Sequence, residues 1–155
     1  QGTVNIPEFD PETFRSKASY YVPSNYYLSG HYTLGTPEQP FILYIDGDLT
    51  TYGNVTISGY GVIIVEGSIR VNHSVTMVGS MENNRLGVFA DGEIRFTRPA
   101  TVAAHFYTND TVRFDQAVTL HGSITAGRDF RMDASVNINY LEVAPALTEP
   151  FWPSN

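Results

Sequence analysis

The feature that most constrains the fold of this 155-residue chain is an internal repeat of short apolar patterns. Five stretches can be aligned so that the same positions are apolar nearly every time. Three columns of that alignment are apolar throughout: Leu49, Ile69, Ile94, Val112 and Phe130; then, six residues earlier, Leu43, Ile63, Val88, Phe106 and Ile124; and, six residues later, Val55, Val75, Ala100, Val118 and Val136. A column two residues after the first has one polar member, Thr51. Such columns indicate side chains that enter one common interior.

The spacing of the repeat predicts the fold class. Successive members of the first column are 20, 25, 18 and 18 residues apart, so an 18-residue unit carries insertions near Tyr60–Val62 and Ser80–Leu86. Each unit holds three short alternations of inward and outward residues, separated by turn pairs such as Asp46-Gly47. Stacked units of this kind bury a continuous core. The sequence therefore predicts an all-β protein, a parallel β-solenoid of triangular section with about five to six coils.

The hand of the coil is predicted less directly. Right-handed crossovers are the general preference and favour a right-handed solenoid. Coils of 18 residues also suit left-handed hexapeptide helices, in which glycine typically follows an aliphatic residue. Glycine here more often follows an acid, as in Glu66-Gly67 and Asp91-Gly92, and we expect the right-handed form.

We expect a single domain over residues 1–155, with five stacked coils over residues 41–140. Residues 1–37 are predicted to form an N-terminal cap and an irregular leading coil, in which Leu28, Tyr32 and Leu34 point inward. Asp10-Pro11-Glu12 is typical of a helix start and predicts a short capping helix from Pro11 to Ala18. The proline-rich residues 141–155 are expected to form a C-terminal cap or linker.

The amino-acid composition limits the kinds of partner that the chain can bind. The formal net charge is -7 with nine Lys and Arg together, which disfavours nucleic-acid binding because phosphate contacts need clustered cations. No apolar run is long enough to span a bilayer, so we expect no membrane contact by this stretch of chain, although an anchor upstream is compatible with it. Cysteine is absent, which excludes a disulfide framework and zinc-thiolate sites.

Two outward columns are candidate binding surfaces. The first contains half of the eight arginines and is called here the arginine ladder: Arg70, Arg95, Arg113 and Arg131. Stacked guanidinium groups can bind a polyanion such as an acidic glycan. Acids in the flanking columns, among them Asp115 and Asp133, favour instead a surface network of cross-strand ion pairs.

The second column is called here the aromatic row: Tyr44, Ile64, Phe89 and Tyr107, with Ile42 and Val62 beside it. A contiguous apolar row that points away from the core has to be covered. The cover is either intramolecular, from the capping helix or the Ser80–Leu86 insertion, or a partner protein or a second copy. We expect the row to be an interaction surface.

The sequence gives no support for catalysis. The four histidines fall in different columns without the spacing of a metal site, and neither a nucleophile elbow nor a phosphate loop occurs. We therefore predict a non-enzymatic protein with no catalytic residues, no metal site and no cofactor.

Four segments resemble the β-solenoid ectodomains of bacterial PilX-like proteins, which are associated with type IV pili in the cell envelope. They are Tyr44–Leu49, Asn54–Ile63, and the pair Ser123–Gly127 and Val136–Tyr140. The leading Pro7–Asp10 is similar to theirs as well. The resemblance implies a structural or adhesive module at the periplasmic or extracellular surface, with protein partners in an envelope or pilus assembly. The 18-residue triangular coil is also similar to bactofilins, which implies a polymer-forming scaffold as an alternative, and an acidic-glycan-binding β-helix is a third.

Overall fold

The computed structural model describes residues 15–78 and 84–140, which form a single sheet of 14 strands. The strands are β1 (Tyr20–Val22), β2 (Tyr26–Thr33), β3 (Phe41–Ile45), β4 (Leu49–Ser58), β5 (Tyr60–Val65), β6 (Ile69–Val71), β7 (Val75–Met77), β8 (Arg85–Ala90), β9 (Ile94–Phe96), β10 (Ala100–Thr108), β11 (Thr111–Phe114), β12 (Val118–Ala126), β13 (Asp129–Met132) and β14 (Val136–Tyr140). Every strand pair in this described part is parallel. This confirms the predicted all-β class.

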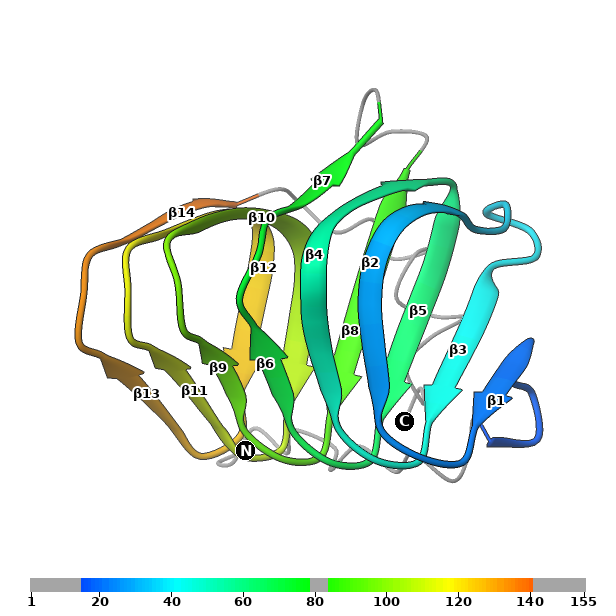
Figure 1. Cartoon of the computed structure of the whole chain (residues 1–155), viewed down its shortest axis with the longest axis horizontal. Helices are drawn as coiled ribbons and strands as arrows, with labels where there is room; N and C mark the ends of the chain where they lie inside the picture. The colour runs from blue at the N-terminus through cyan, green and yellow to red at the C-terminus, as the bar shows by residue number, and fades with distance from the viewer. Residues whose placement is uncertain (1–14, 79–83, 141–155) are drawn as a thin grey trace, which may run out of the picture.

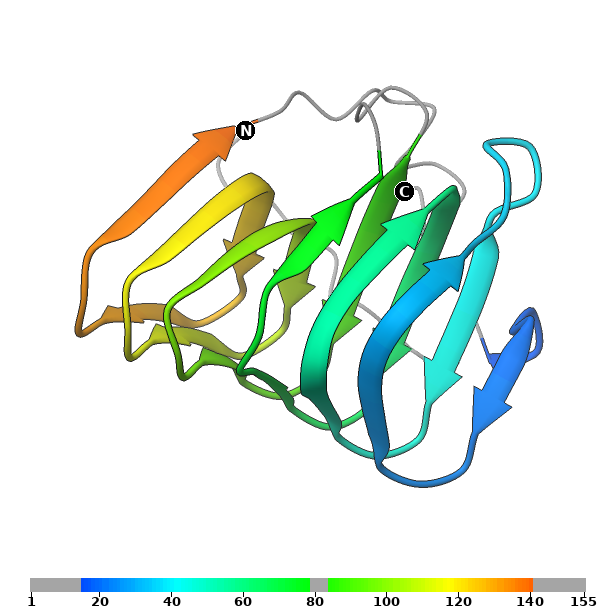
Figure 2. The ribbon, with the colours of Figure 1, turned by 45° about the horizontal axis from the view of Figure 1, so that its top comes forward.

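The strands lie in three stacks that wind around one interior. One stack runs β1, β3, β5, β8 and continues into the second parts of β10 and β12. A second runs from the first parts of β2 and β4 through β6, β9, β11 and β13. The third runs from the second parts of β2 and β4 through β7, β10 and β12 to β14. Figures 1 and 2 show the resulting β-solenoid of about 6 turns. Its predicted right-handed sense stays a prediction.

The pairing registers confirm the predicted columns. Leu49 pairs with Ile69, Ile69 with Ile94, Ile94 with Val112 and Val112 with Phe130. The column that begins at Leu43 continues in the same way through Ile63, Val88 and Phe106 to Ile124. Equivalent side chains of successive turns are therefore superposed along the solenoid.

One register differs from the predicted alignment. Val75 of β7 pairs with Val102 of β10, whereas the sequence alignment placed Val75 beside Ala100. The difference is two residues, which keeps every side chain on its own face because strands alternate with a period of two. Apolar residues alternate on both sides of the shift, so the pattern alone does not fix this register.

The interior is filled by apolar side chains stacked turn on turn. Phe96 and Phe114 lie parallel with ring centroids 4.7 Å apart and an interplanar angle of 8°, and both are fully buried. Thr51, the polar member of its column, is also buried, and its hydroxyl accepts the backbone N–H of Asn72 at 2.8 Å. That hydrogen bond explains how a polar residue occupies a core column.

Glycines stack at one corner of the solenoid. Gly67 N donates to Gly47 O at 2.9 Å, and Gly92 N donates to Gly67 O at 2.8 Å. A Cβ atom on Gly67 would lie 2.1 Å from Asp48 Oδ1 and 2.7 Å from Gly47 O, so the close approach of successive turns excludes a side chain there. The acid-glycine turns of the repeat are thus explained by space at this corner.

The predicted leading coil is present, since Leu28 is buried and Tyr32 and Leu34 pack against the main core. Most of the predicted helix from Pro11 to Ala18 lies outside the described residues. Within them, Ala18 N donates to Arg15 O at 3.4 Å, which is a single turn. Residues 141–155, predicted as a cap or linker, lie outside the described part as well.

Candidate functional site

The aromatic row forms a second apolar cluster outside the solenoid interior. Tyr44, Val62, Ile64 and Phe89 are between 0% and 2% exposed. Partly buried residues that pack against this cluster are Ala18, Tyr21, Ile42, Tyr60 and Tyr107. The alternation predicted correctly that the row points away from the main core. Its four central side chains are buried in the structure, which is the intramolecular alternative that the sequence left open, and the role of the row as an interaction surface stays a prediction.

Aromatic contacts and hydroxyl hydrogen bonds hold this cluster together. The rings of Tyr21 and Tyr44 are stacked with centroids 5.7 Å apart, and Phe89 meets Tyr107 edge to face at 5.2 Å. The Tyr44 hydroxyl donates to Glu66 Oε2, and the Tyr21 hydroxyl donates to Asp46 Oδ2 at 2.9 Å. Each of these two tyrosines thus satisfies its polar end at the acid of a nearby turn.

The arginine ladder is the second predicted surface, and the structure brings its members together. Arg70 pairs with Arg95, Arg95 with Arg113 and Arg113 with Arg131 in adjacent strands. Thr50 and Tyr27 continue the same column toward the first turn. Tyr27 was not predicted as part of it, because the leading coil carries too weak a repeat to be aligned.

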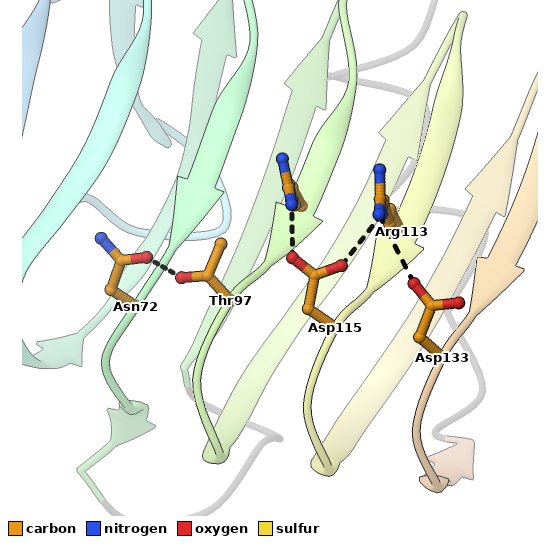
Figure 3. Close-up of polar contacts among 6 residues, drawn as sticks. Asn72, Thr97, Arg113, Asp115 and Asp133 are labelled. Carbon is orange, nitrogen blue, oxygen red and sulfur yellow. Dashed lines mark hydrogen bonds and ion pairs between the residues drawn. The ribbon is translucent and has the colours of Figure 1, made fainter.

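Aspartates one corner away neutralise the middle of the arginine ladder. Asp115 Oδ2 accepts from Arg95 Nε at 2.6 Å, and Asp115 Oδ1 accepts from Arg113 Nε at 2.9 Å. Arg113 also reaches Asp133 at 3.6 Å. Figure 3 shows that these groups and the neighbouring Asn72–Thr97 hydrogen bond lie in one line along the solenoid. The hydrogen bond from Arg95 is the main cause that lowers the pKa of Asp115.

This network favours the ion-pair interpretation of the arginine ladder over the polyanion one. Arg95 and Arg113 share a carboxylate, and Arg131 lies 4.0 Å from Asp129. Guanidinium groups already paired with carboxylates are poor sites for a long anion, because binding would have to displace those partners. The polyanion prediction is therefore weakened for three of its four residues.

Arg70 is the exception in the arginine ladder. Arg70 is exposed and makes no ion pair or side-chain hydrogen bond within residues 15–78 and 84–140. It borders a hollow of about 300 Å³, called here the Arg70 hollow. The hollow is lined by Asn25, Tyr27, Asp48, Leu49, Thr50, Ser68, Ile69, Arg70, Glu93 and Arg95. Short side chains at Thr50 and Ser68 leave this space between the larger Tyr27 and Arg70.

His105 is a buried titratable group that the sequence pattern did not single out. It is 5% exposed, and its Nδ1 lies 2.9 Å from Ser123 Oγ of the next turn. Nε2 is buried and has no hydrogen-bond partner in the described part of the chain. Burial, with a smaller contribution from the charge of Arg85, lowers the pKa of His105 to about 4. The imidazole is therefore neutral at physiological pH.

Comparison with known proteins gives no family. No family model, curated protein or solved structure matches the chain. Within the described residues no group of three or more His, Cys, Asp or Glu side chains is arranged to hold a metal ion. Searching those same ranges for a helix long and apolar enough to cross a membrane also finds none.

Proposed function

We propose that this chain is a non-enzymatic structural module of a cell-envelope or pilus-type assembly, exposed on the periplasmic or extracellular side. In this role the solenoid acts as a rigid spacer and docking surface. The observation that carries the proposal is the continuity of its core, since buried columns run through successive turns and Thr51 is the polar member of one of them. Backbone ladders between all neighbouring turns add to this, and such a construction resists bending at any single point.

The outward faces support the same proposal. Their strongest polar contacts are Arg95–Asp115 and Arg113–Asp115, which join successive turns to one another. These ion pairs stabilise the contact between turns and leave no free charge at Asp115 for a ligand, because each of its carboxylate oxygens already has an arginine partner. With the aromatic row buried, the Arg70 hollow is the docking surface we propose, because exposed Tyr27 and Arg70 are residue types that dominate protein interfaces.

Localisation in cells tests the proposal. Immunogold electron microscopy and fractionation of cells that make the protein in its natural form should place it in the envelope or along surface fibres. A protein found only in the cytosol would reject the proposed compartment. Docking is tested with purified pilus fibres from the same cells, on which Arg70→Ala should weaken binding and Arg128→Ala, an exposed arginine on the last turn, should not.

The Arg70 hollow also favours a second candidate function, the binding of an acidic glycan. Arg70 has no carboxylate partner in the described residues, and a guanidinium beside an exposed tyrosine suits a sugar that bears a carboxylate, provided that the sugar carboxylate avoids Asp48 and Glu93, which also line the hollow. A glycan array of uronic-acid oligosaccharides decides this. Retention that is lost in Arg70→Ala and at high salt would support it, and the absence of any retained acidic glycan would reject it.

A further inference from the structure

The two ends of the solenoid differ in how their core columns finish. Leu28 of β2 and Met132 of β13 are the first and last members of one inward column, and they are 5% and 56% exposed. Tyr26 and Phe130 end the neighbouring column, where Tyr26 is partly buried and Phe130 is 41% exposed. These two columns are thus covered at β2 and open at β13, whereas in the column that begins with Tyr20 of β1, which pairs with Leu43, Tyr20 is 55% exposed and Ile124 is 6% exposed.

The edge strands at the two ends of the solenoid also differ in how regular they are. At the open end β13 pairs with β11 and β14 with β12, and neither has a further strand beside it in the described part of the chain (Figure 1). At the covered end the three-residue β1 pairs only with β3 in the described part of the chain, and the register of β2 shifts between Leu28 and Gly30, where Gly30 has φ of +91°. An irregular edge of that kind blocks the addition of another strand, whereas a regular one invites it.

The charges of β13 are self-complementary. Outward Asp129, Arg131 and the following Asp133 alternate with the inward Phe130 and Met132. Antiparallel registers of β13 with its own copy keep the apolar side chains inside when they are centred on Phe130, Arg131 or Met132, and the one centred on Arg131 sets like charges opposite each other. The two registers that remain are centred on Phe130 and on Met132. In the first Arg131 lies opposite Asp129 of the other copy, and in the second it lies opposite Asp133.

We propose that the chain forms a closed homodimer in which the last turns of two copies meet end to end across a two-fold axis through β13. Phe130 and Met132 become buried and supply the affinity, while the reciprocal Arg131–aspartate pairs set the register. The interface is isologous, so it uses the open end of both copies at once. The covered end at β2 takes no part, which stops growth at two copies.

This inference does not rest on the proposed function. A dimer that forms in the test tube leaves the compartment and the docking partner of the protein open. Failure of the dimer likewise leaves the spacer proposal intact, because a monomeric solenoid is also rigid.

Sedimentation velocity of the purified chain over a rising concentration series tests the proposal. We expect a reversible monomer–dimer equilibrium, and Met132→Lys should raise the dimer Kd by roughly a hundredfold because it places a charge in the apolar contact. Tyr52→Lys is the matched control, since Tyr52 is 74% exposed on a side face and should leave the dimer unchanged. Thermal melting of each variant by circular dichroism confirms that it is folded.

A charge exchange makes the test independent of any loss of stability. R131D makes the edge strand uniformly acidic and D129R/D133R makes it uniformly basic, so each variant alone should be monomeric. Their equimolar mixture should restore a heterodimer. The proposal is overturned by a wild-type chain that stays monomeric at high micromolar concentration, by filaments in electron micrographs, by a dimer that Met132→Lys does not weaken, or by a mixture that stays monomeric.

Discussion

Asp115 Oδ2 accepts a hydrogen bond from Arg95 Nε at 2.6 Å, although the two residues are 20 positions apart in the chain. That separation is one 18-residue turn, from Arg95 to its partner Arg113, plus two residues, so the contact crosses from one turn to the next. The second oxygen of the same carboxylate accepts from Arg113 Nε at 2.9 Å. One aspartate therefore joins two arginines that would otherwise repel each other on neighbouring strands.

Removing that charge should destabilise the solenoid. We expect Asp115→Asn to lower the free energy of unfolding by about 1 kcal/mol, because the side chains of Asp115 and Arg95 are only 19% and 33% exposed and screening is incomplete. Asp133→Asn is the matched control, since Asp133 is 60% exposed and its contact with Arg113 is 3.6 Å long. Urea unfolding at neutral pH measures both, and equal effects of the two variants would contradict the proposed role of Asp115.

The same pair predicts a dependence on acid. The pKa of Asp115 is lowered in the folded state, so its contribution to stability is present above the unfolded value of 3.8 and is lost as the pH falls through the lower folded pKa. The unfolding free energies of the wild type and Asp115→Asn should therefore converge in strong acid. A difference that stays constant from neutral pH to acid would show that the charge of Asp115 is not its cause.

His105 should make the protein less stable in mild acid. Its pKa is about 4 in the folded state and 6.5 when exposed, so the unfolded chain binds the proton first as the pH falls. Stability is fully present above 6.5 and is lost toward pH 4, by about 2 kcal/mol at pH 5. His105→Gln should remove this part of the pH dependence and His31→Gln, at an exposed site, should not. Chemical unfolding between pH 5 and pH 7 checks this prediction. Equal slopes of the unfolding free energy against pH for the wild type and His105→Gln would contradict it.

The fold was predictable from the sequence because every turn has to place apolar side chains at the same inward positions. Leu43, Ile63, Val88, Phe106 and Ile124 occupy equivalent positions in successive turns and were aligned correctly before any coordinates. The Val75–Val102 pairing was missed because a shift of two residues preserves the alternation that carries the signal.

The candidate sites were predicted less completely. The alternation that separates inward from outward side chains does not say what covers an outward residue, so the sequence left open whether Tyr44, Ile64 and Phe89 are covered within the chain or by a partner. The pairing of the arginine ladder with Asp115 and Asp133 was predictable, since neighbouring columns of opposite charge were visible in the alignment. His105 gave no signal, because its burial and its contact with Ser123 depend on how the turns pack.

The glycine corner predicts a sharp cost of a single methyl group. Gly67→Ala should destabilise the fold by about 2 kcal/mol, because the new Cβ would lie 2.1 Å from Asp48 Oδ1 and 2.7 Å from the Gly47 carbonyl oxygen. Gly53→Ala is the control at an ordinary site, where the nearest atom to a new Cβ is the Ser29 Cβ at 3.4 Å. Thermal and urea unfolding measure both variants. A Gly67→Ala protein as stable as Gly53→Ala would mean that successive turns do not pack this closely.

Thr51 tests whether a polar residue in the core column is there for its hydroxyl. Thr51 is 3% exposed, and its Oγ1 accepts the backbone N–H of Asn72 at 2.8 Å. Thr51→Val keeps the shape but leaves that N–H without its acceptor, so we expect a loss of about 1 to 2 kcal/mol in unfolding free energy despite the gain in hydrophobicity. Thr51→Ser keeps the hydroxyl and loses only a methyl group, which should cost about 1 kcal/mol, and it should retain slow hydrogen exchange at the Asn72 amide. Accelerated exchange at Asn72 in Thr51→Val alone would establish the hydrogen bond as the reason for threonine at this position, and a Thr51→Val protein more stable than the wild type would show that the column prefers an apolar residue throughout.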